Sequence, residues 1–281
     1  MSSVGESSIL PSMPQVSSAS CGKKTRFSMK AEAKDITPGA FLAAYDALVQ
    51  AGGGNALEGD LARLQEDFQR RTGTFRQDDP AAEVDARSRA FWDDALTQPG
   101  FAARAAAELA PGARPERLDE VVGGLGRAHR GLFVVEEASR TEALLVDLWS
   151  GAELVVRVLD EAQALALEHA EGAVDGRVVP VARTLFLLPG AFHHPADATP
   201  HFAAVLDAAR ERTMGTAALL DALLRMERVL RTSSRVKAAY AYRTSGLVRA
   251  AVPPAPPSRP SSRSLATQAV SPSTDDDRGA R

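Results

Sequence analysis

Apolar residues recur at helical spacing through the first part of the chain and change to short extended runs in its middle. Behind Thr37-Pro38, a capping residue followed by a proline at the first helical position, Phe41, Tyr45 and Leu48 fall on one side of a helix. Similar patterns predict helices that begin after Gly59 and after Asp79-Pro80, and shorter ones over 101–109 and 118–125. Residues 37–130 therefore form a predicted helical block.

The middle of the chain, from residue 131 onwards, is rich in short aliphatic runs. These runs predict five strands, over 131–137, 143–149, 153–158, 177–181 and 184–188, with a helix over 160–170. Because the runs are nearly continuous instead of alternating, we expect burial on both faces, as in a small closed barrel or a helix-covered sheet. Pro180 lacks a backbone donor and predicts that strand four lies at an edge or a bulge.

Two further helices are predicted, one from Thr199-Pro200 and one from about residue 216 to residue 242. The predicted fold is α+β, with an N-terminal helical block, a central five-stranded barrel or sheet and two C-terminal helices. The expected boundaries are a disordered arm over 1–36, helices over 37–130, a β-module over 131–195, helices over 196–249 and a disordered Pro/Ser/Arg tail over 250–281.

The amino-acid composition is that of a globular protein. Hydrophobic residues make up 44% and charged residues 25%, as in ordinary globular domains, and the net charge is -3. The single cysteine, Cys21, excludes an internal disulfide framework. We expect no membrane span and, without a recognisable secretory signal, a cytoplasmic location. Met29 is an alternative start, and the Ala-rich, Lys-poor composition indicates a GC-rich bacterial genome.

One pattern runs through three successive segments of the β-module, which cover 131–135, 146–153 and 176–181. A hairpin with an Asp-Leu-x-x-Gly turn is followed by a strand that contains Gly-Arg. In this respect the module resembles small β-modules of uncharacterised bacterial proteins. The resemblance implies a fold, and it implies no chemical role for any of these positions.

A histidine-rich loop is the first candidate site. It contains His193, His194, Asp197 and His201, whose imidazole and carboxylate groups suit zinc, iron or nickel. Their spacing matches no established metalloenzyme motif. The alternative is a polar loop in which Asp197 lies near a helix N-terminus, where a carboxylate is stabilised.

A basic segment is the second candidate. Residues 210–249 contain nine basic and three acidic residues. The predicted helix brings Arg225, Arg228 and Arg235 to one side, where they would bind a protein partner or the phosphates of a nucleic acid. Alternatively, the helix docks on the acidic helical block of its own chain. The β-module is acidic, which weighs against nucleic acid.

Sequence motifs support no enzyme class and no cofactor. There is no Gly-x-Ser-x-Gly motif, and the glycines at 123, 124 and 126 end a predicted helix where a phosphate-binding loop would open one. Asp93-Asp94 is expected on a solvated helix face. The predicted function is therefore a non-enzymatic, regulatory protein that binds an unknown protein partner. A nucleic-acid-associated protein is the alternative, and a metal-dependent enzyme is the second alternative.

Overall fold

The computed structural model describes residues 35–74, 79–233 and 235–247. Most of the predicted arm (1–36) and the whole of the predicted tail (250–281) lie outside this range. Ile36, which we had assigned to the arm, is only 5% exposed and belongs to the hydrophobic core. The folded part therefore begins at least one residue earlier than the sequence predicted.

The N-terminal helical block is confirmed. It consists of α1 (Pro38–Gly52), α2 (Glu58–Thr72), α3 (Ala81–Thr97), α4 (Phe101–Glu108) and α5 (Leu118–Leu125). The predicted cap of α1 is present, because the Thr37 side chain accepts a hydrogen bond from the Ala40 amide at 3.2 Å. Asp79 does not cap α3. Its carboxylate instead accepts a hydrogen bond from Arg228 of the distant C-terminal region.

The β-module is a closed barrel. Its strands are β1 (His129–Ala138), β2 (Glu142–Asp147), β3 (Glu153–Arg157), β4 (Val174–Val181) and β5 (Thr184–Leu187), and the short β6 (Phe192–His193) adds to β4. The strand order is β1-β2-β3-β5-β4, and the β1–β4 pairing completes the circle. With α6 (Glu161–Glu168) between β3 and β4, this is the connectivity of an OB-type Greek-key barrel. Topology alone assigns no ligand.

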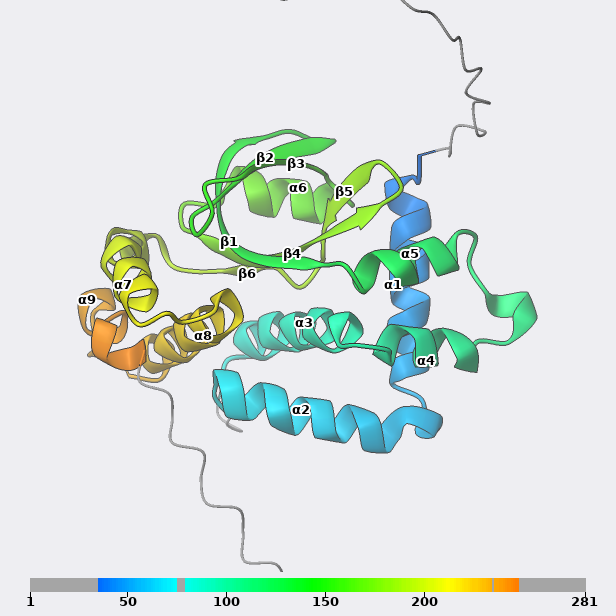
Figure 1. Ribbon diagram of the computed structural model, residues 1–281, viewed down its shortest axis with the longest axis horizontal. Coiled ribbons are helices and arrows are strands. Elements are labelled where there is room, and N and C mark those ends of the chain that lie inside the picture. Colours follow the sequence, from blue (N-terminus) through cyan, green and yellow to red (C-terminus); the bar gives the residue numbers. More distant parts are fainter. Residues whose placement is uncertain (1–34, 75–78, 234, 248–281) are drawn as a thin grey trace, which may run out of the picture. The chain divides into compact units, whose positions relative to one another are not determined.

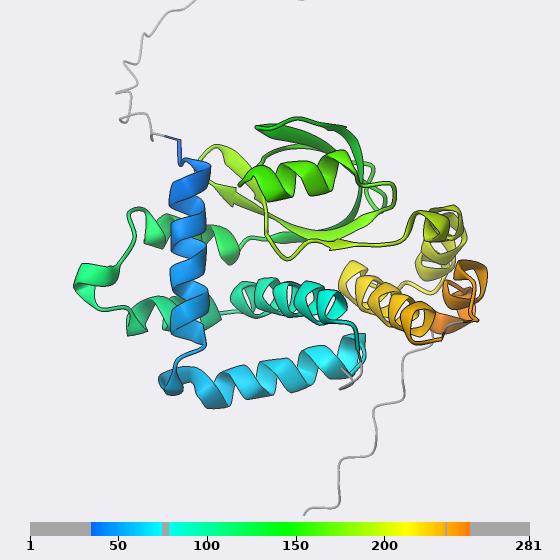
Figure 2. The ribbon, with the colours of Figure 1, turned by 180° about the vertical axis from the view of Figure 1, so that it is seen from behind.

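Alternate side chains fill the barrel. Phe133, Leu145 and Val156 point inward from three neighbouring strands, and Ala164 and Leu167 of α6 join the same hydrophobic cluster. The helix therefore closes one end of the barrel. In Figure 2, α6 lies across the front of the strands.

One wall of the barrel packs against the helical block. Val179, Phe186 and Leu188 point outward from the β4–β5 side into the cluster formed by the helices, and the Phe186 ring stacks on Phe41 with centroids 4.5 Å apart. Figure 1 shows α5 and α3 on the β4 side of the barrel, whereas none of the helices of the described residues lies over the outer side of β2 and β3. The barrel thus has a covered wall and an exposed wall.

The C-terminal helices are α7 (Thr199–Glu211), α8 (Thr216–Thr232) and the short α9 (Ala238–Ala241). They form a second hydrophobic cluster with Leu132 of β1. The predicted helix over 216–242 is wrong, because α8 ends at Thr232 and Ser233 adopts an extended conformation. The short helix α9 follows that break.

Two predictions about the strands also need correction. Strand β4 is not an edge strand, since it pairs with β1, β5 and β6. Pro180 lies beyond the last β1 partner, Val178, and pairs only with β5, so its missing donor costs no ladder bond to β1. Burial on both faces holds for β4 but not for β3, where Val155 is 57% exposed.

Candidate interaction surfaces

The four predicted metal ligands do not converge. Among the residues that the structure describes, no group of three His, Cys, Asp or Glu side chains is placed to hold a metal ion. Asp197 is exposed, and His194 is buried on another side of the loop. Its Nδ1 lies 2.9 Å from the Tyr242 hydroxyl, and Phe192 and Phe202 contact its ring edge-on. Burial lowers the pKa of His194 to about 4, so the imidazole is neutral and acts as part of the core.

The three predicted partner-binding arginines are separated. Arg228 is 7% exposed and pairs with Asp79 and with Glu83, at 2.6 and 2.8 Å. Arg225 donates to the backbone carbonyl of Arg71. Arg235 lies beyond the end of α8 and is exposed. Two of the three therefore join α8 to the helical block of the same chain, as in the internal-docking alternative.

A buried ionic network, here called the charged joint, ties the helical block, the barrel and α8 together. Its members are Arg71 of α2, Asp94 of α3, Arg130 of β1, Asp175 and Arg177 of β4, and Asp221 of α8.

Arg130 is the central cation of the charged joint. Its Nε and Nη2 donate to both oxygens of Asp175 at 3.0 and 2.7 Å, and its Nη1 donates to Asp221 at 2.7 Å. Arg71 donates to Asp221 from one guanidinium nitrogen, and from another it donates to Asp94 at 2.6 Å. Burial by itself destabilises the charged forms of these arginine and aspartate side chains. The Arg130 guanidinium nevertheless holds the pKa of Asp175 below its ordinary value.

Asp93 and Asp94 are buried, so the prediction that they form a solvated helix face is wrong. Asp94 accepts hydrogen bonds from Arg71 and Arg177. Asp93 accepts from the Tyr45 hydroxyl at 2.7 Å and from the Gly190 amide at 2.9 Å. Burial raises the pKa of Asp93 to about 7. Neither carboxylate is placed to attack a substrate, because both are occupied by partners from the same chain.

A pocket of about 350 Å³ lies over the charged joint, lined by Arg71, Arg130 and Arg177 together with Asp67, Asp94 and Asp221. Three cations and three anions line it, so it offers no net charge that would favour an anionic or a cationic ligand. The physical role of these groups is to hold three regions of the chain in register.

His129, Asp147 and Ser150 form a small polar cluster that resembles a nucleophilic triad only in composition. The Asp147 carboxylate is the hub, 3.2 Å from His129 Nε2 and 2.7 Å from the Ser150 hydroxyl. A nucleophilic serine needs a direct hydrogen bond to its base. Here serine and histidine both bind the aspartate, so the cluster fixes the β2–β3 turn.

The exposed wall of the barrel is the outer face of β1, β2 and β3. It carries four aliphatic side chains that join none of the hydrophobic clusters of the described residues: Val134, Leu144, Val146 and Val155. Val134 lies opposite Val146, and Leu144 lies opposite Val155, so the four form one continuous strip. Val155 is 57% exposed and the other three are half-buried, so the strip is a partly exposed apolar surface and a candidate binding site.

Charged side chains surround this strip. Glu137 lies opposite Leu144 on β1, Glu153 lies opposite Val146 on β3, and Glu142 forms an exposed 3.4 Å pair with Arg157. The rim thus holds three carboxylates and one guanidinium. It favours a cationic partner and repels phosphate.

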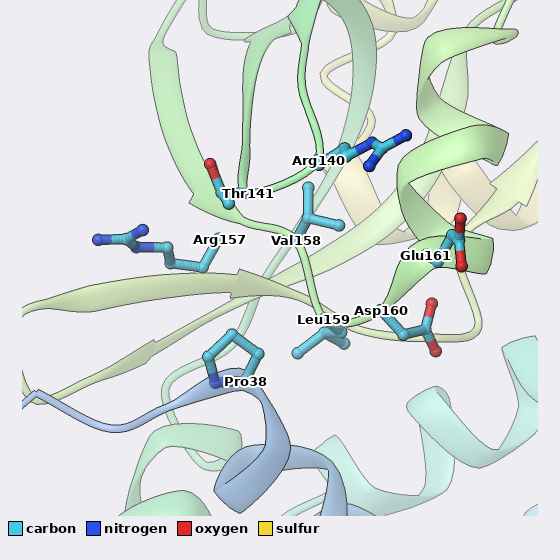
Figure 3. A pocket seen from close by; sticks show the side chains of 8 residues that line it. All are labelled: Pro38, Arg140, Thr141, Arg157, Val158, Leu159, Asp160 and Glu161. Atoms are coloured by element: carbon cyan, nitrogen blue, oxygen red, sulfur yellow. The ribbon is translucent and has the colours of Figure 1, made fainter.

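A pocket of about 460 Å³ adjoins the exposed wall at Arg157. Figure 3 shows Pro38 on one side of it, Arg140 and Thr141 on the other, and Asp160 and Glu161 at the start of α6. Val158 and Leu159 lie between these polar groups. The pocket shares Arg157 with the exposed wall, and none of the four strip residues lines it.

A basic surface lies at the opposite end of the sequence, on the end of α8, α9 and the residues that follow. This C-terminal corner consists of Arg231, Arg235, Lys237, Tyr240 and Arg243, all of which are exposed. Between residues 228 and 247 the sequence contains no acidic residue. Tyr240 is 60% exposed, and the Arg243 guanidinium lies 5.5 Å from the centre of its ring.

Comparison with known proteins adds no assignment, since no family model, curated protein or solved structure matches the chain. Among the described residues, no helix is both long and apolar enough to span a membrane.

The exposed wall is not apparent from the sequence. Its signal was present in β2, where Leu144 and Val146 alternate with the inward-facing Ala143 and Leu145, but apolar residues on both faces obscured that alternation. The outward residues can be recognised only when the strand register is known.

Proposed function

We propose that the chain is a non-enzymatic protein that acts by binding another polypeptide on the exposed wall of its barrel. One observation carries the proposal: Val134, Leu144, Val146 and Val155 form an aliphatic strip that is left out of every hydrophobic cluster of the described residues. Burying such a strip against a partner gains on the order of 25 cal/mol per Å² of apolar surface.

The rim narrows the chemistry of the partner. Glu137, Glu142 and Glu153 favour a segment whose apolar residues are flanked by lysine or arginine. The charged joint supports a binding role and not a catalytic one, since its carboxylates and guanidinium groups bind each other. Regulation through such binding is the expected biological role, inside the cell.

Affinity capture with matched variants tests the proposal. The tagged full chain, recovered from nuclease-treated lysate, is expected to retain a discrete protein partner that Leu144→Lys with Val155→Lys loses. Leu165→Lys is the control, because Leu165 is an equally exposed aliphatic residue on α6, outside the wall. A partner that all three proteins retain equally would contradict the proposal.

Nucleic-acid binding remains the alternative, and the C-terminal corner is the observation that favours it. An exposed tyrosine among arginines suits stacking on single-stranded bases. Arg225 and Arg228, on which the sequence argument depended, are engaged inside the chain. The corner retains Arg235 alone of the three predicted arginines.

A further inference from the structure

The exposed wall and the C-terminal corner are complementary in charge and in chemistry. The wall offers aliphatic groups inside a ring of carboxylates, contributed by Glu137, Glu142 and Glu153. The corner offers the exposed Tyr240 ring, with the Arg243 guanidinium 5.5 Å from its centre and the exposed Arg235 and Lys237 close by in the chain. The two surfaces therefore match each other. Apolar groups would meet at the centre of the contact, and opposite charges would meet at its edge.

Neither surface suits a copy of itself. Two exposed walls brought face to face would oppose six carboxylates to two guanidinium groups, and two corners would oppose cations to cations. Like charges across an interface disfavour association strongly. A symmetric dimer through either surface alone is therefore disfavoured electrostatically.

The two surfaces belong to different parts of the fold. The wall is formed by β1, β2 and β3, whereas α9 contacts α8 and the 3-10 turn Ala196–Ala198 that precedes α7. Figures 1 and 2 both show α9 beside α8, with β2 and β3 elsewhere. Within the described residues, the corner and the wall are thus separate surfaces, so the corner of one molecule can meet the wall of another.

We infer that a second copy of this chain binds the exposed wall through its C-terminal corner, so that molecules associate head to tail. Tyr240 packs on the strip formed by Leu144 and Val155, and Arg235, Lys237 and Arg243 face Glu137, Glu142 and Glu153. Such a contact is heterologous, and it closes into a ring or extends as a filament according to the rotation between neighbours. The inference rests on the proposed function, because it takes the wall to be a protein-binding surface.

Sedimentation velocity of the full chain, over a range of concentrations and at low ionic strength, tests the inference. The wild-type protein is expected to form species larger than a monomer, and added salt is expected to dissociate them. A wall variant, Glu142→Lys with Glu153→Lys, and a corner variant, Lys237→Glu with Arg243→Glu, are each expected to be monomeric. Each double reversal is expected to raise the dissociation constant on the order of a hundredfold.

Mixing the two variants gives the sharpest result. The wall variant keeps an intact corner and the corner variant keeps an intact wall, so an equimolar mixture is expected to associate although each variant alone stays monomeric. The control variants, Glu108→Lys with Glu116→Lys and Arg114→Glu with Arg183→Glu, change exposed charges elsewhere and are expected to associate as the wild type does. Tyr240→Phe is expected to preserve association, and Tyr240→Ala to weaken it.

Several outcomes would overturn the inference. A wild type that is monomeric at every concentration would do so, as would a variant mixture that stays monomeric. A monomeric wild type that binds fluorescent oligo(dT) through Lys237 and Arg243 would assign the corner to nucleic acid. If self-association is absent while capture of another protein still depends on Leu144 and Val155, the inference fails and the proposed function stands. If both are absent, both fail.

Discussion

Strands β3 and β4 have similar apolar sequences but opposite surroundings. In β4 nearly every residue is buried, because helices cover its outer side. In β3 only Val156 is buried, and its neighbours Val155 and Arg157 face solvent. On the covered side, charges such as Arg130 and Asp175 bind each other, whereas charges on the exposed side surround an aliphatic strip. An apolar run therefore indicates a strand, and what covers the strand decides whether it belongs to the core or to the surface.

The largest expected effect comes from replacing one arginine on the covered side of the barrel and comparing it with one on the exposed side. Arg130→Met leaves Asp175 without the guanidinium that binds both its oxygens, and we expect a loss of about 3–5 kcal/mol in unfolding free energy. Arg157→Met breaks an exposed pair and is expected to cost less than about 0.5 kcal/mol. Urea denaturation measures both values. Equal effects would mean that the charged joint contributes no more than a surface pair.

The pH dependence of stability gives a second test of the covered side. Burial raises the pKa of Asp93 to about 7 from 3.8, so the native state keeps a proton that the unfolded state releases between these values. The contribution of Asp93 to stability is therefore greatest below the unfolded pKa and declines as pH rises from about 4 to about 7, by on the order of 3 kcal/mol.

The matched variant for this test is Asp93→Asn. Urea denaturation at several pH values is expected to show the wild type losing stability relative to the variant as pH rises. The buried His194 has the opposite effect, since its pKa is lowered and its stabilising neutral form is lost on acidification. It is present in both proteins and cancels in the difference. Parallel curves would show that Asp93 ionises normally.

Two adjacent glycines test how closely the helical block approaches the covered wall. A Cβ on Gly124 of α5 would lie 2.7 Å from the Pro180 carbonyl oxygen, and we expect Gly124→Ala to cost about 1–3 kcal/mol. A Cβ on Gly123 would have no neighbour within 4 Å, and Gly123→Ala is expected to stabilise by about 0.5–1 kcal/mol through helix propensity. Thermal denaturation of the two variants shows whether each change raises or lowers the stability of the protein. A stabilising effect of Gly124→Ala would place α5 away from β4.

The smallest expected effect lies on the exposed wall itself. Val155→Ala removes a side chain that is 57% exposed and is expected to change unfolding free energy by less than about 0.5 kcal/mol. Val179→Ala on β4 removes a fully buried one and is expected to cost about 2 kcal/mol. Urea denaturation of the pair is the measurement. A large loss at Val155 would indicate a structural role in place of a binding one.

Local pattern predicted most of the elements. The five barrel strands and the helix between the third and fourth were recognised from their apolar runs and turn residues, within a few positions of their observed ends. The two-residue strand β6 is too short to produce a pattern. The end of α8 at Thr232 could not be predicted, because polar residues such as Ser233 occur both in helices and at their ends.

The charged joint and the two candidate interaction surfaces depend on the positions of residues that are distant in sequence. Arg71 and Asp221 are 150 positions apart, and no local pattern pairs them. Asp93 and Asp94 are neighbours in α3 that point to different partners, Tyr45 and Arg177, so their adjacency alone suggested a solvated face. The basic corner was partly visible as an excess of arginine, but only the fold separates exposed arginines from buried ones.

The charged joint also places a condition on synthesis of the chain from its N-terminus. Arg130 emerges from the ribosome long before Asp221, which follows 91 positions later and completes its set of partners. Until α8 has been translated, Arg71 and Arg130 each lack one carboxylate partner, although Asp94 and Asp175 are already present to bind them. A nascent chain that stops before α8 can therefore pack the helical block on the barrel, but it leaves two guanidinium groups at the surface where the C-terminal helices will dock.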